Sequence, residues 1–326
     1  MATIYDVARR AGVSTYTVSV VLNRSAKVSE ELTKRVLEAA QELDYSINRI
    51  ASSLQTRRTN TIGMLIPDIA NPWYARVVRG VEDVLTANNY SLFLGSTRDD
   101  AAVQARYLDV YNARQVDGTL IFHAPGSEPD LARLSRQRAP VVYVGRIPRT
   151  LEADTVTADN RLGAKLATGH LISKGHTKIA IITGPQSLSV FKDRVSGWKT
   201  ALKRAGVEVN PAYNREADGT QVGGYGETLQ LLALKEPPTA YFAGNLLMMM
   251  GVLKALKEKK VRIPKDVEVM SADDSDWLDA FNPPISVIEQ PSYTLGAEAA
   301  QLLLRRIQKP DSPFEHIVLT PQLKIR

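Results

Sequence analysis

Short runs of β-branched and apolar residues alternate with helix-like segments along most of the chain, beginning near residue 61. The first run is TIGMLIP, and it is followed in order by YSLFLGS, GTLIF, PVVYVG, KIAIITG, TAYFAG and VEVMSA. A helix-like segment from about Trp73 to Ala87 separates the first two runs. Alternation of this kind predicts parallel sheets with helices on both faces. A second series begins near Asp159, so we expect two similar α/β lobes.

Composition narrows the class of protein. A chain of 326 residues is longer than one hydrophobic core usually supports, so two or three folding units are expected. The sequence contains no cysteine, which excludes disulfides, thiol catalysis and cysteine-ligated metal. It contains no apolar run long enough to cross a bilayer, and its first residues lack the pattern of a secretory signal. We therefore expect a cytoplasmic protein with no membrane association.

Two short helical patterns meet at a glycine turn in residues 3–23, TIYDVARRAGVSTYTVSVVLN. Thr3 can cap the first helix, and Asp6 lies three residues later, where its carboxylate can pair with the cap. Gly12 can adopt the positive φ that ends a helix, and Ser14 can cap the next helix. This layout is typical of a helix-turn-helix that reads DNA, although a small hairpin that packs only on itself has the same pattern.

A third amphipathic segment follows the two short helices. Ser29 can cap it, and its apolar stripe comprises Leu32, Val36, Leu37, Ala40 and Leu43. Residues 1–60 hold nine Lys or Arg against six Asp or Glu, so they carry half of the net charge of +6. Positive charge beside a reading helix supplies phosphate attraction, whereas the alternative is an ordinary solvated face.

Several longer strings carry a family resemblance. They are TIYDVARRAGVS, TVSVVLN, VSEELTKRVLEAAQELDY, ASSLQTRRTNTIG, PDIANPWYARVVRGVED, QVDGTLI, TADNRLGAKLATGHLISKGHTKIAIITGP, DRVSGWKTAL, PTAYFAGN, VRIPKDVEVMSADDSDW and FNPPISVIEQP. In this order and spacing they make the chain resemble the lac repressor family of bacterial transcription regulators over nearly all of its length. The resemblance implies an N-terminal three-helix helix-turn-helix domain and a two-lobed, periplasmic-binding-protein-like core of parallel sheets.

The resemblance also implies domain boundaries. The helix-turn-helix domain would cover residues 1–46, a hinge segment 47–60, and an effector-binding and dimerisation core 61–326. Within the core, lobe 1 would comprise about 61–159 plus 291–326, and lobe 2 about 160–290.

Roles at the DNA follow from the same resemblance. Bases would be read by Thr15, Tyr16 and Val20, and phosphate contact or support would come from Ser14, Thr17, Ser19 and Asn23. Val20 cannot hydrogen-bond a guanine and should instead contact a thymine methyl group.

In the hinge, Leu54, with Ala51 near it, would be inserted into the minor groove, where an apolar wedge kinks the duplex. The alternative for Leu54 is an ordinary linker leucine. Ile47 and Ser52 depart from the proline and arginine that the family often has, so one phosphate contact is expected to be missing.

A small effector is implied in the cleft between the lobes. The residues that match the family there are Trp73, Tyr74, Arg194, Asp273 and Trp277. The aromatic rings offer flat apolar faces to a sugar ring or a base, while the guanidinium and carboxylate suit hydroxyl pairs. The alternative for each residue is packing or a salt bridge between the lobes.

Three positions depart from the sugar-binding members of the family. Gly145 and Leu246 stand where many of them carry aspartates, and Gly219 stands where an aromatic residue is frequent. Loss of two hydroxyl acceptors argues against a neutral sugar read in the usual way. With Arg146 and Lys192 near the cleft, a sugar acid or sugar phosphate is an alternative effector.

The sequence gives little support to two other classes of protein, an enzyme and a transport receptor. Doubly wound sheets host many enzymes, but GPQSLSV lacks the ending of a phosphate loop and no nucleophile elbow is present. The four histidines lack metal-ligand spacing, so we expect no catalytic residue, no metal and no cofactor. A periplasmic-type sugar receptor would need a signal peptide and would not need residues 1–60. We expect instead a transcriptional repressor that binds a near-palindromic double-stranded operator as a homodimer, without the leucine heptads of a tetramer.

Overall fold

The computed structural model describes residues 2–23, 27–45, 58–134, 139–148 and 152–326. By its internal contacts the chain divides into two compact units, Met1–Thr59 and Asn60–Arg326. Each unit has its own hydrophobic core, as the length of the chain predicts.

The described residues of the first unit form three helices around a small core. They are α1 (Ile4–Ala11), α2 (Thr15–Asn23) and α3 (Glu30–Glu42). The core is made by Val7, Ala8, Ala11, Val18, Val21, Val36, Ala39 and Ala40. The prediction that Leu37 belongs to the apolar stripe of the third helix was wrong. Leu37 is 50% exposed, because the buried face of α3 carries Val36, Ala39 and Ala40 and position 37 is turned about 100° from Val36 around the helix.

The caps predicted for these helices are confirmed. Thr3 and Asp6 form a capping box, in which the Thr3 backbone N–H donates to Asp6 Oδ2 (2.9 Å) and the Asp6 N–H donates to Thr3 Oγ1 (3.4 Å). Gly12 ends α1 in the left-handed region, with φ +63° and ψ +41°. The Ser14 hydroxyl accepts from the Thr17 N–H (3.1 Å) at the start of α2.

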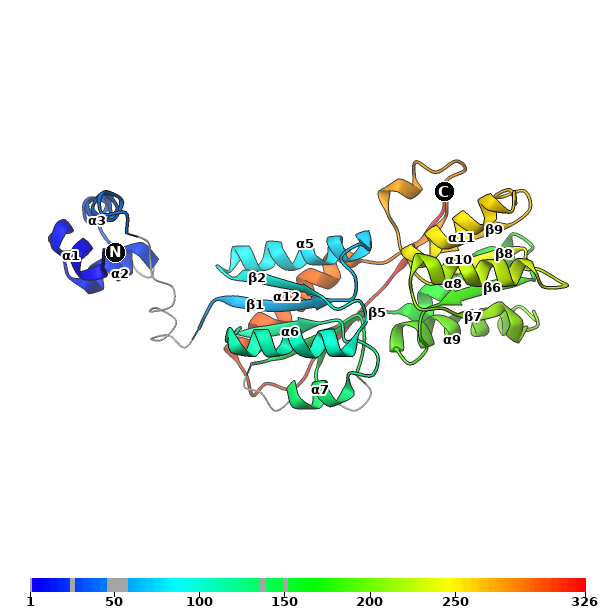
Figure 1. Cartoon of the computed structure of the whole chain (residues 1–326), viewed down its shortest axis with the longest axis horizontal. Coiled ribbons are helices and arrows are strands. Elements are labelled where there is room, and N and C mark those ends of the chain that lie inside the picture. Colours follow the sequence, from blue (N-terminus) through cyan, green and yellow to red (C-terminus); the bar gives the residue numbers. More distant parts are fainter. Residues whose placement is uncertain (1, 24–26, 46–57, 135–138, 149–151) are drawn as a thin grey trace. The chain divides into compact units, whose positions relative to one another are not determined.

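The second unit contains two α/β lobes (Figure 1), as the alternation of patterns predicts. Lobe 1 is built on a fully parallel sheet with the strand order β11-β5-β4-β3-β1-β2. Its strands are β1 (Thr61–Ile66), β2 (Ser91–Ser96), β3 (Gly118–Ile121), β4 (Val141–Val144), β5 (Asp154–Ala158) and β11 (His316–Leu319).

Helices cover both faces of this first sheet because successive strand residues point to opposite sides. They are α5 (Pro72–Ala87), α6 (Ala101–Ala113), α7 (Glu128–Leu134) and α12 (Ser292–Gln308). Ile62, Met64 and Ile66 of β1 pack with α5 and α12, whereas Leu65 packs with α6 and α7. The final helix thus returns to the first lobe.

Lobe 2 is built on a sheet with the order β12-β10-β9-β8-β6-β7. Its strands are β6 (Ile179–Thr183), β7 (Asn214–Glu216), β8 (Ala240–Ala243), β9 (Glu268–Ser271), β10 (Val287–Glu289) and β12 (Gln322–Lys324). Its helices are α8 (Asn160–Ser173), α9 (Ser189–Arg204), α10 (Gln221–Leu232) and α11 (Leu246–Glu258), with the short 3-10 turns η1 (Pro211–Tyr213) and η2 (Asp276–Leu278). All strand pairs are parallel except β10 with β12.

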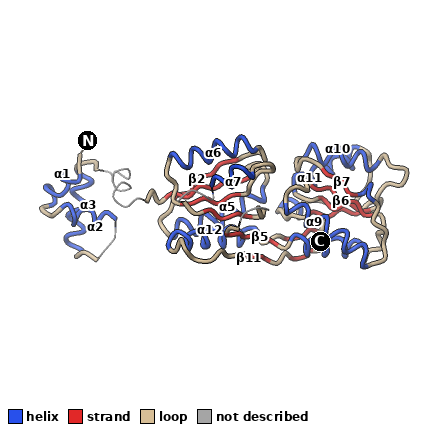
Figure 2. The backbone as a smooth tube through the Cα atoms, turned by 90° about the horizontal axis from the view of Figure 1, so that it is seen from below, coloured by secondary structure: helices blue, strands red, loops and turns tan. Residues whose placement is uncertain are grey.

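The chain crosses between the lobes three times, after β5, after β10 and after β11 (Figure 2). The last crossing differs from the expectation that all of residues 291–326 lie in lobe 1. Strand β12 pairs with β10 of the second sheet, with Val287 opposite Lys324. Backbone hydrogen bonding at the edge of that sheet therefore draws the end of the chain into lobe 2.

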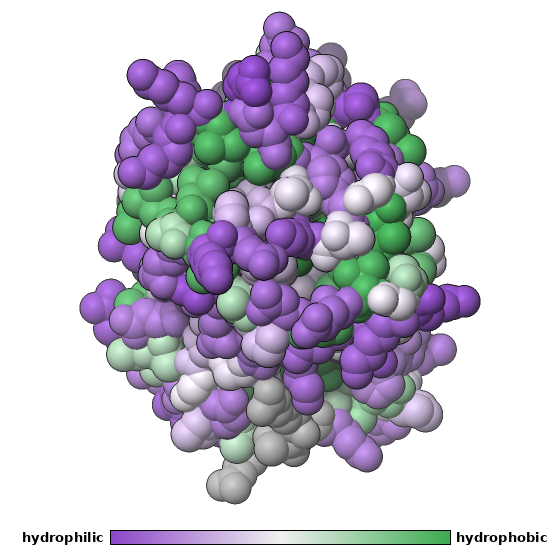
Figure 3. All heavy atoms as spheres, turned by 90° about the vertical axis from the view of Figure 1, so that its right-hand side faces the viewer, coloured by the Kyte–Doolittle hydropathy of each residue, from purple (hydrophilic) through white to green (hydrophobic). Residues whose placement is uncertain are grey.

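The surface is predominantly polar on the face that Figure 3 shows, with hydrophobic residues in separate groups among hydrophilic ones. Within the described ranges, no helix has both the length and the apolar character needed to cross a membrane.

Candidate functional site

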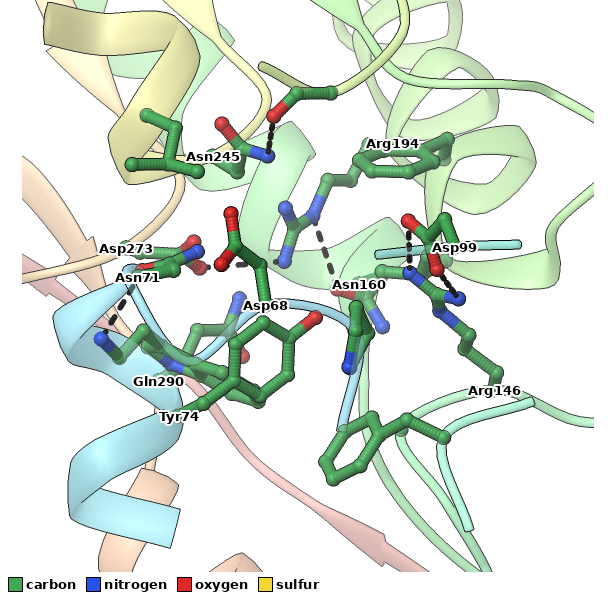
Figure 4. A pocket seen from close by; sticks show the side chains of 18 of the residues that line it. Asp68, Asn71, Tyr74, Asp99, Arg146, Asn160, Arg194, Asn245, Asp273 and Gln290 are labelled. Carbon is green, nitrogen blue, oxygen red and sulfur yellow. Dashed lines mark hydrogen bonds and ion pairs between the residues drawn. The ribbon is translucent and has the colours of Figure 1, made fainter. Parts of the chain in front are cut away.

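A cavity of about 280 Å³ lies between the two lobes. Most of its lining residues follow the carboxyl ends of parallel strands, where ligands bind in open α/β sheets. Lobe 1 contributes Asp68, Asn71, Trp73, Tyr74, Arg98, Asp99, Phe122, Gly145, Arg146 and Ala158, and lobe 2 contributes Asn160, Phe191, Arg194, Asp218, Gly219, Asn245, Asp273 and Gln290. Figure 4 shows how these polar and aromatic side chains converge.

Three aromatic rings form one wall of the cavity. Asn71 caps α5 by accepting from the Trp73 N–H (3.1 Å), and Pro72 begins the helix. The first turn of α5 therefore presents Trp73 and Tyr74 to the cavity, edge to face with centroids 5.0 Å apart. Phe122 completes the wall, 6.0 Å from Trp73 and 5.2 Å from Tyr74. Such a wall suits the apolar face of a sugar ring.

Arg194 lies at the centre of a buried polar cluster. From α9 its Nε donates to Asn160 Oδ1 (3.0 Å), its Nη1 donates to the Gly244 carbonyl, and its Nη2 donates to Asp273 Oδ1 (3.5 Å). Burial raises the pKa of the Asp273 carboxyl above its usual range, and the positive charge of Arg194 partly opposes this shift. The cluster holds a carboxylate with free lone pairs against the cavity.

A second charged pair lies on the lobe 1 side. The Arg146 guanidinium donates to both carboxylate oxygens of Asp99, at 2.5 and 3.1 Å, and to the His123 carbonyl at 2.7 Å. Tyr74 interacts with the same guanidinium. Burial raises the pKa of the Tyr74 hydroxyl, which therefore remains protonated at neutral pH.

Two buried polar atoms of the lining have no hydrogen-bond partner among the described residues. They are Trp73 Nε1, a donor, and Gln290 Oε1, an acceptor. Buried polar groups in folded proteins are nearly always satisfied, so two unpaired atoms on lining residues are unusual.

Four of the five predicted effector residues line the cavity. Trp73, Tyr74, Arg194 and Asp273 are brought together in the cavity. Trp277 is not among the lining residues; it packs, partly buried, against the lobe 2 core. Asp273 lines the cavity, but four residues later the 3-10 turn η2 directs Trp277 toward the lobe 2 core.

Of the three positions that depart from the family pattern, Gly145 and Gly219 line the cavity and Leu246 does not. Leu246 is fully buried and does not line the cavity, whereas Asn245 does and caps α11 through the Met248 N–H (2.7 Å). Gly145 and Gly219 both line the cavity with positive φ. Lys192 is exposed and is not part of the lining.

Several lining residues were missed from the sequence. They include Asp68, Asn71, Arg98, Asp99, Asn160, Asp218, Asn245 and Gln290. A usable signal existed for most of them, since polar residues directly after an apolar run at a strand end face the ligand crevice. That rule gives Asp68 after TIGMLIP and Asn245 after TAYFAG.

In the first unit, the predicted base readers lie near the start of α2. Tyr16 is 75% exposed, and Thr15 is partly exposed. Val20 is only 7% exposed, so its methyl groups offer little surface to a base in this structure. The side chain of Asn23 and all of Ile47, Ala51, Ser52 and Leu54 lie outside the described residues.

The fold and the cavity define a class of protein: a two-lobed small-molecule receptor joined to a three-helix unit of helix-turn-helix form. Comparisons with known proteins agree. The model of bacterial regulatory proteins of the lacI family matches residues 3–48, and that of a periplasmic binding protein-like domain matches residues 168–326. The ribose operon repressor of Escherichia coli K12 is 38% identical over 327 residues, covering 100% of this chain and 99% of the repressor.

Solved structures give the same result. A lac repressor dimer bound to operator and the anti-inducer ONPF matches with a TM-score of 0.86 at 26% identity, covering 100% of this chain and 98% of the repressor chain. A LacI family regulator from Enterococcus faecium with bound ribose matches with a TM-score of 0.71 at 30% identity, covering 82% and 97%. This chain belongs to the lacI family of bacterial transcription regulators. It is a DNA-binding regulator controlled by a small-molecule effector, and not an enzyme.

Proposed function

We propose that this protein is a cytoplasmic repressor that binds a near-palindromic operator as a homodimer and responds to a neutral monosaccharide, with ribose as the first candidate. Ribose is suggested by the names of relatives: a ribose operon repressor and a ribose-bound regulator resemble this chain over most of its length.

The charge of the cavity is the observation that carries the choice of a neutral sugar. Its lining contains four carboxylates (Asp68, Asp99, Asp218 and Asp273) and three guanidiniums (Arg98, Arg146 and Arg194). Both buried guanidiniums already face a carboxylate, Arg146 facing Asp99 and Arg194 facing Asp273. A phosphate or sugar acid would add negative charge to a lining that already has one excess carboxylate. The carboxylates also supply the hydroxyl acceptors that Gly145 and Leu246 do not.

The DNA-binding part of the proposal depends on α2. Thr15 and Tyr16 would meet base edges in the major groove, with Ser14, Thr17, Ser19 and Asn23 as phosphate or support residues. Val20 would reach a thymine methyl only if DNA binding uncovers its side chain. Leu54 and Ala51 would form the minor-groove part of the hinge.

Calorimetry and a mobility-shift assay test the effector assignment. The full chain is titrated with ribose, ribose 5-phosphate and ribonate, and each compound is added to a complex with operator DNA selected from a random pool. We expect ribose to bind and to change operator affinity, with the two anions weaker. Tighter binding of either anion, or no response of the DNA complex to any of the three compounds, would contradict the proposal.

The hinge is tested separately. Leu54→Ala should weaken operator binding while leaving sugar affinity unchanged, because it removes an apolar wedge outside the effector cavity. Unchanged operator affinity would refute the minor-groove role of Leu54.

A further inference from the structure

Both residues of the Asp99–Arg146 salt bridge line the effector cavity. The Arg146 side chain is 4% exposed and that of Asp99 is 28% exposed. The pair is bidentate, with Arg146 Nη1 and Nη2 each donating to a different oxygen of Asp99. The two hydrogen bonds hold the guanidinium and the carboxylate together at the cavity wall (Figure 4).

The backbone explains why the carboxylate comes from residue 99 rather than from residue 145. Gly145 has φ +67°, and a Cβ there would lie 2.6 Å from Cε1 of Phe122. An aspartate at 145 would therefore collide with the aromatic wall. Asp99 reaches the same guanidinium from the loop after β2, where both it and Arg98 have positive φ (+57° and +54°). That conformation is uncommon for residues other than glycine and is concentrated at ligand sites.

This pair retains hydrogen-bonding capacity toward the cavity. A guanidinium has five N–H donors, and a carboxylate has about four lone-pair sites. Three N–H groups of Arg146 donate to Asp99 (two) and to the His123 carbonyl (one), Tyr74 engages the same guanidinium, and each Asp99 oxygen accepts once from Arg146. One guanidinium N–H and further carboxylate lone pairs therefore remain in the same pair, and two neighbouring hydroxyl groups require one donor and one acceptor.

We propose that the Asp99–Arg146 pair reads two adjacent hydroxyls of the effector, and that Asp99 sets selectivity for a sugar that carries both. This inference rests on the proposed function, since it assigns a role within the same cavity. Asp99 accepts a hydrogen bond from one hydroxyl, and Arg146 donates to the other.

Calorimetry with deoxy sugars tests the inference. Ribose, 2-deoxyribose, 3-deoxyribose and 5-deoxyribose are titrated into the full-length wild-type chain and the Asp99→Asn variant. In the wild type, the analogue that lacks the hydroxyl read by Asp99 should bind roughly 10- to 100-fold more weakly than ribose, because a charged acceptor is left unpaired. In Asp99→Asn the ratio between ribose and that analogue should fall toward one.

A matched control separates this role from a general structural one. Asp109→Asn makes the same chemical change in a carboxylate that also pairs with an arginine (Arg133, 2.9 Å) but lies outside the cavity lining. It should keep both the ribose affinity and the ratio. If Asp99→Asn does not fold, as judged by thermal unfolding, Asp99→Ser gives the same ratio test.

The outcomes are distinguishable. A loss of affinity in Asp99→Asn that is equal for ribose and every analogue assigns Asp99 only the support of Arg146 and overturns the inference. Unchanged affinities, or a wild type that does not discriminate any analogue, also overturn it. If the wild type binds none of the four sugars, the proposed function fails, and the inference fails with it.

Discussion

Buried charges at the cavity wall make individual residues sensitive to pH. Asp273 and Arg194 face each other inside the protein, at 3.5 Å, with little exposure to solvent. Removing a charged group from water is costly unless partners compensate, and here three partners of Arg194 do so. The site therefore has fixed polar groups in place before an effector arrives.

Asp273→Asn is expected to weaken effector binding at neutral pH by roughly tenfold or more, because a charged acceptor becomes a neutral amide. In the wild type, burial raises the pKa of Asp273, so affinity should decline with falling pH well before ordinary aspartates protonate. Titration calorimetry at a series of pH values checks both results. An Asp273→Asn variant with the wild-type pH profile would contradict this assignment.

A second pH effect concerns the stability of the fold. Burial, aided by the Arg146 guanidinium, lowers the pKa of His123 below 6.5, and its Nε2 is buried without a partner among the described side chains. Below pH 6.5 the unfolded chain thus binds this proton more readily than the folded chain does. The contribution of His123 to the free energy of unfolding is fully present above pH 6.5. It is lost as the pH falls below that value, by at most about 1.4 kcal/mol per pH unit for one group.

His123→Gln should reduce this slope without abolishing it, because burial also lowers the pKa of His170 and His176. Urea unfolding of the wild type and the variant between pH 7.5 and 5.5 measures how the free energy of unfolding depends on pH. Parallel pH profiles for the two proteins would show that His123 does not contribute.

At this scale the sequence predicts part of the site. Trp73, Tyr74, Arg194 and Asp273 are recognisable because they follow strand runs or family strings. Asp99 cannot be recognised in this way. Its position depends on the left-handed conformation of Arg98 and Asp99, and its role depends on Gly145, which supplies no carboxylate to Arg146. The lost aspartates at 145 and 246 suggested an anionic effector, since the sequence does not show that other carboxylates fill the cavity.

At the scale of elements, the turn between α1 and α2 depends on the left-handed conformation of a single glycine. Gly12 has φ +63°, and its amide and that of Val13 donate back to Arg9 (3.3 Å) and Ala8 (3.0 Å). Arg35 of α3 donates to the Ala11 carbonyl (2.5 Å) and fixes the same turn from the other side.

Gly12→Ala should destabilise the three-helix unit by roughly 1–2 kcal/mol, because a left-handed alanine is strained and its Cβ would lie 2.9 Å from Arg35 Nη2. Faster hydrogen exchange in α1–α3 and weaker operator binding are the expected signs. Tryptophan fluorescence should show an unchanged unfolding of the other unit, since all three tryptophans (73, 198 and 277) lie there.

Gln41→Ala, an exposed change on α3, serves as the control and should leave exchange and operator binding near wild type. Equal exchange in Gly12→Ala and wild type would refute the role of the left-handed turn.

Elements with strong local signals were predicted, and elements decided by tertiary contacts were not. The caps at Thr3 and Ser29 and the helix after Asn71 are encoded within a few residues. Strands β7, β10 and β12 have three residues each and exist because a sheet edge offers them partners. No periodicity can be read from three residues.

At the scale of the whole molecule, the two units have separate cores and separate tasks. The fragment of residues 60–326 should bind the effector with the affinity of the full chain and should not bind operator DNA. Calorimetry and mobility shift with both proteins check this expectation. Operator binding by the fragment, or a loss of sugar affinity, would show that the tasks are not divided in this way.

The three crossings between the lobes have a mechanical consequence. Each is short, joining β5 to α8, β10 to α12, and β11 to β12 through one or two residues. Strands β5 and β11 are paired in one sheet, and β10 and β12 are paired in the other. The connections between the lobes are therefore neighbours. Three neighbouring short connections are expected to resist twisting and sliding of one lobe against the other and to bend most easily across their common line. An effector bound between the lobes is therefore expected to bend one lobe toward the other about that line, so that its binding changes the core in one direction only.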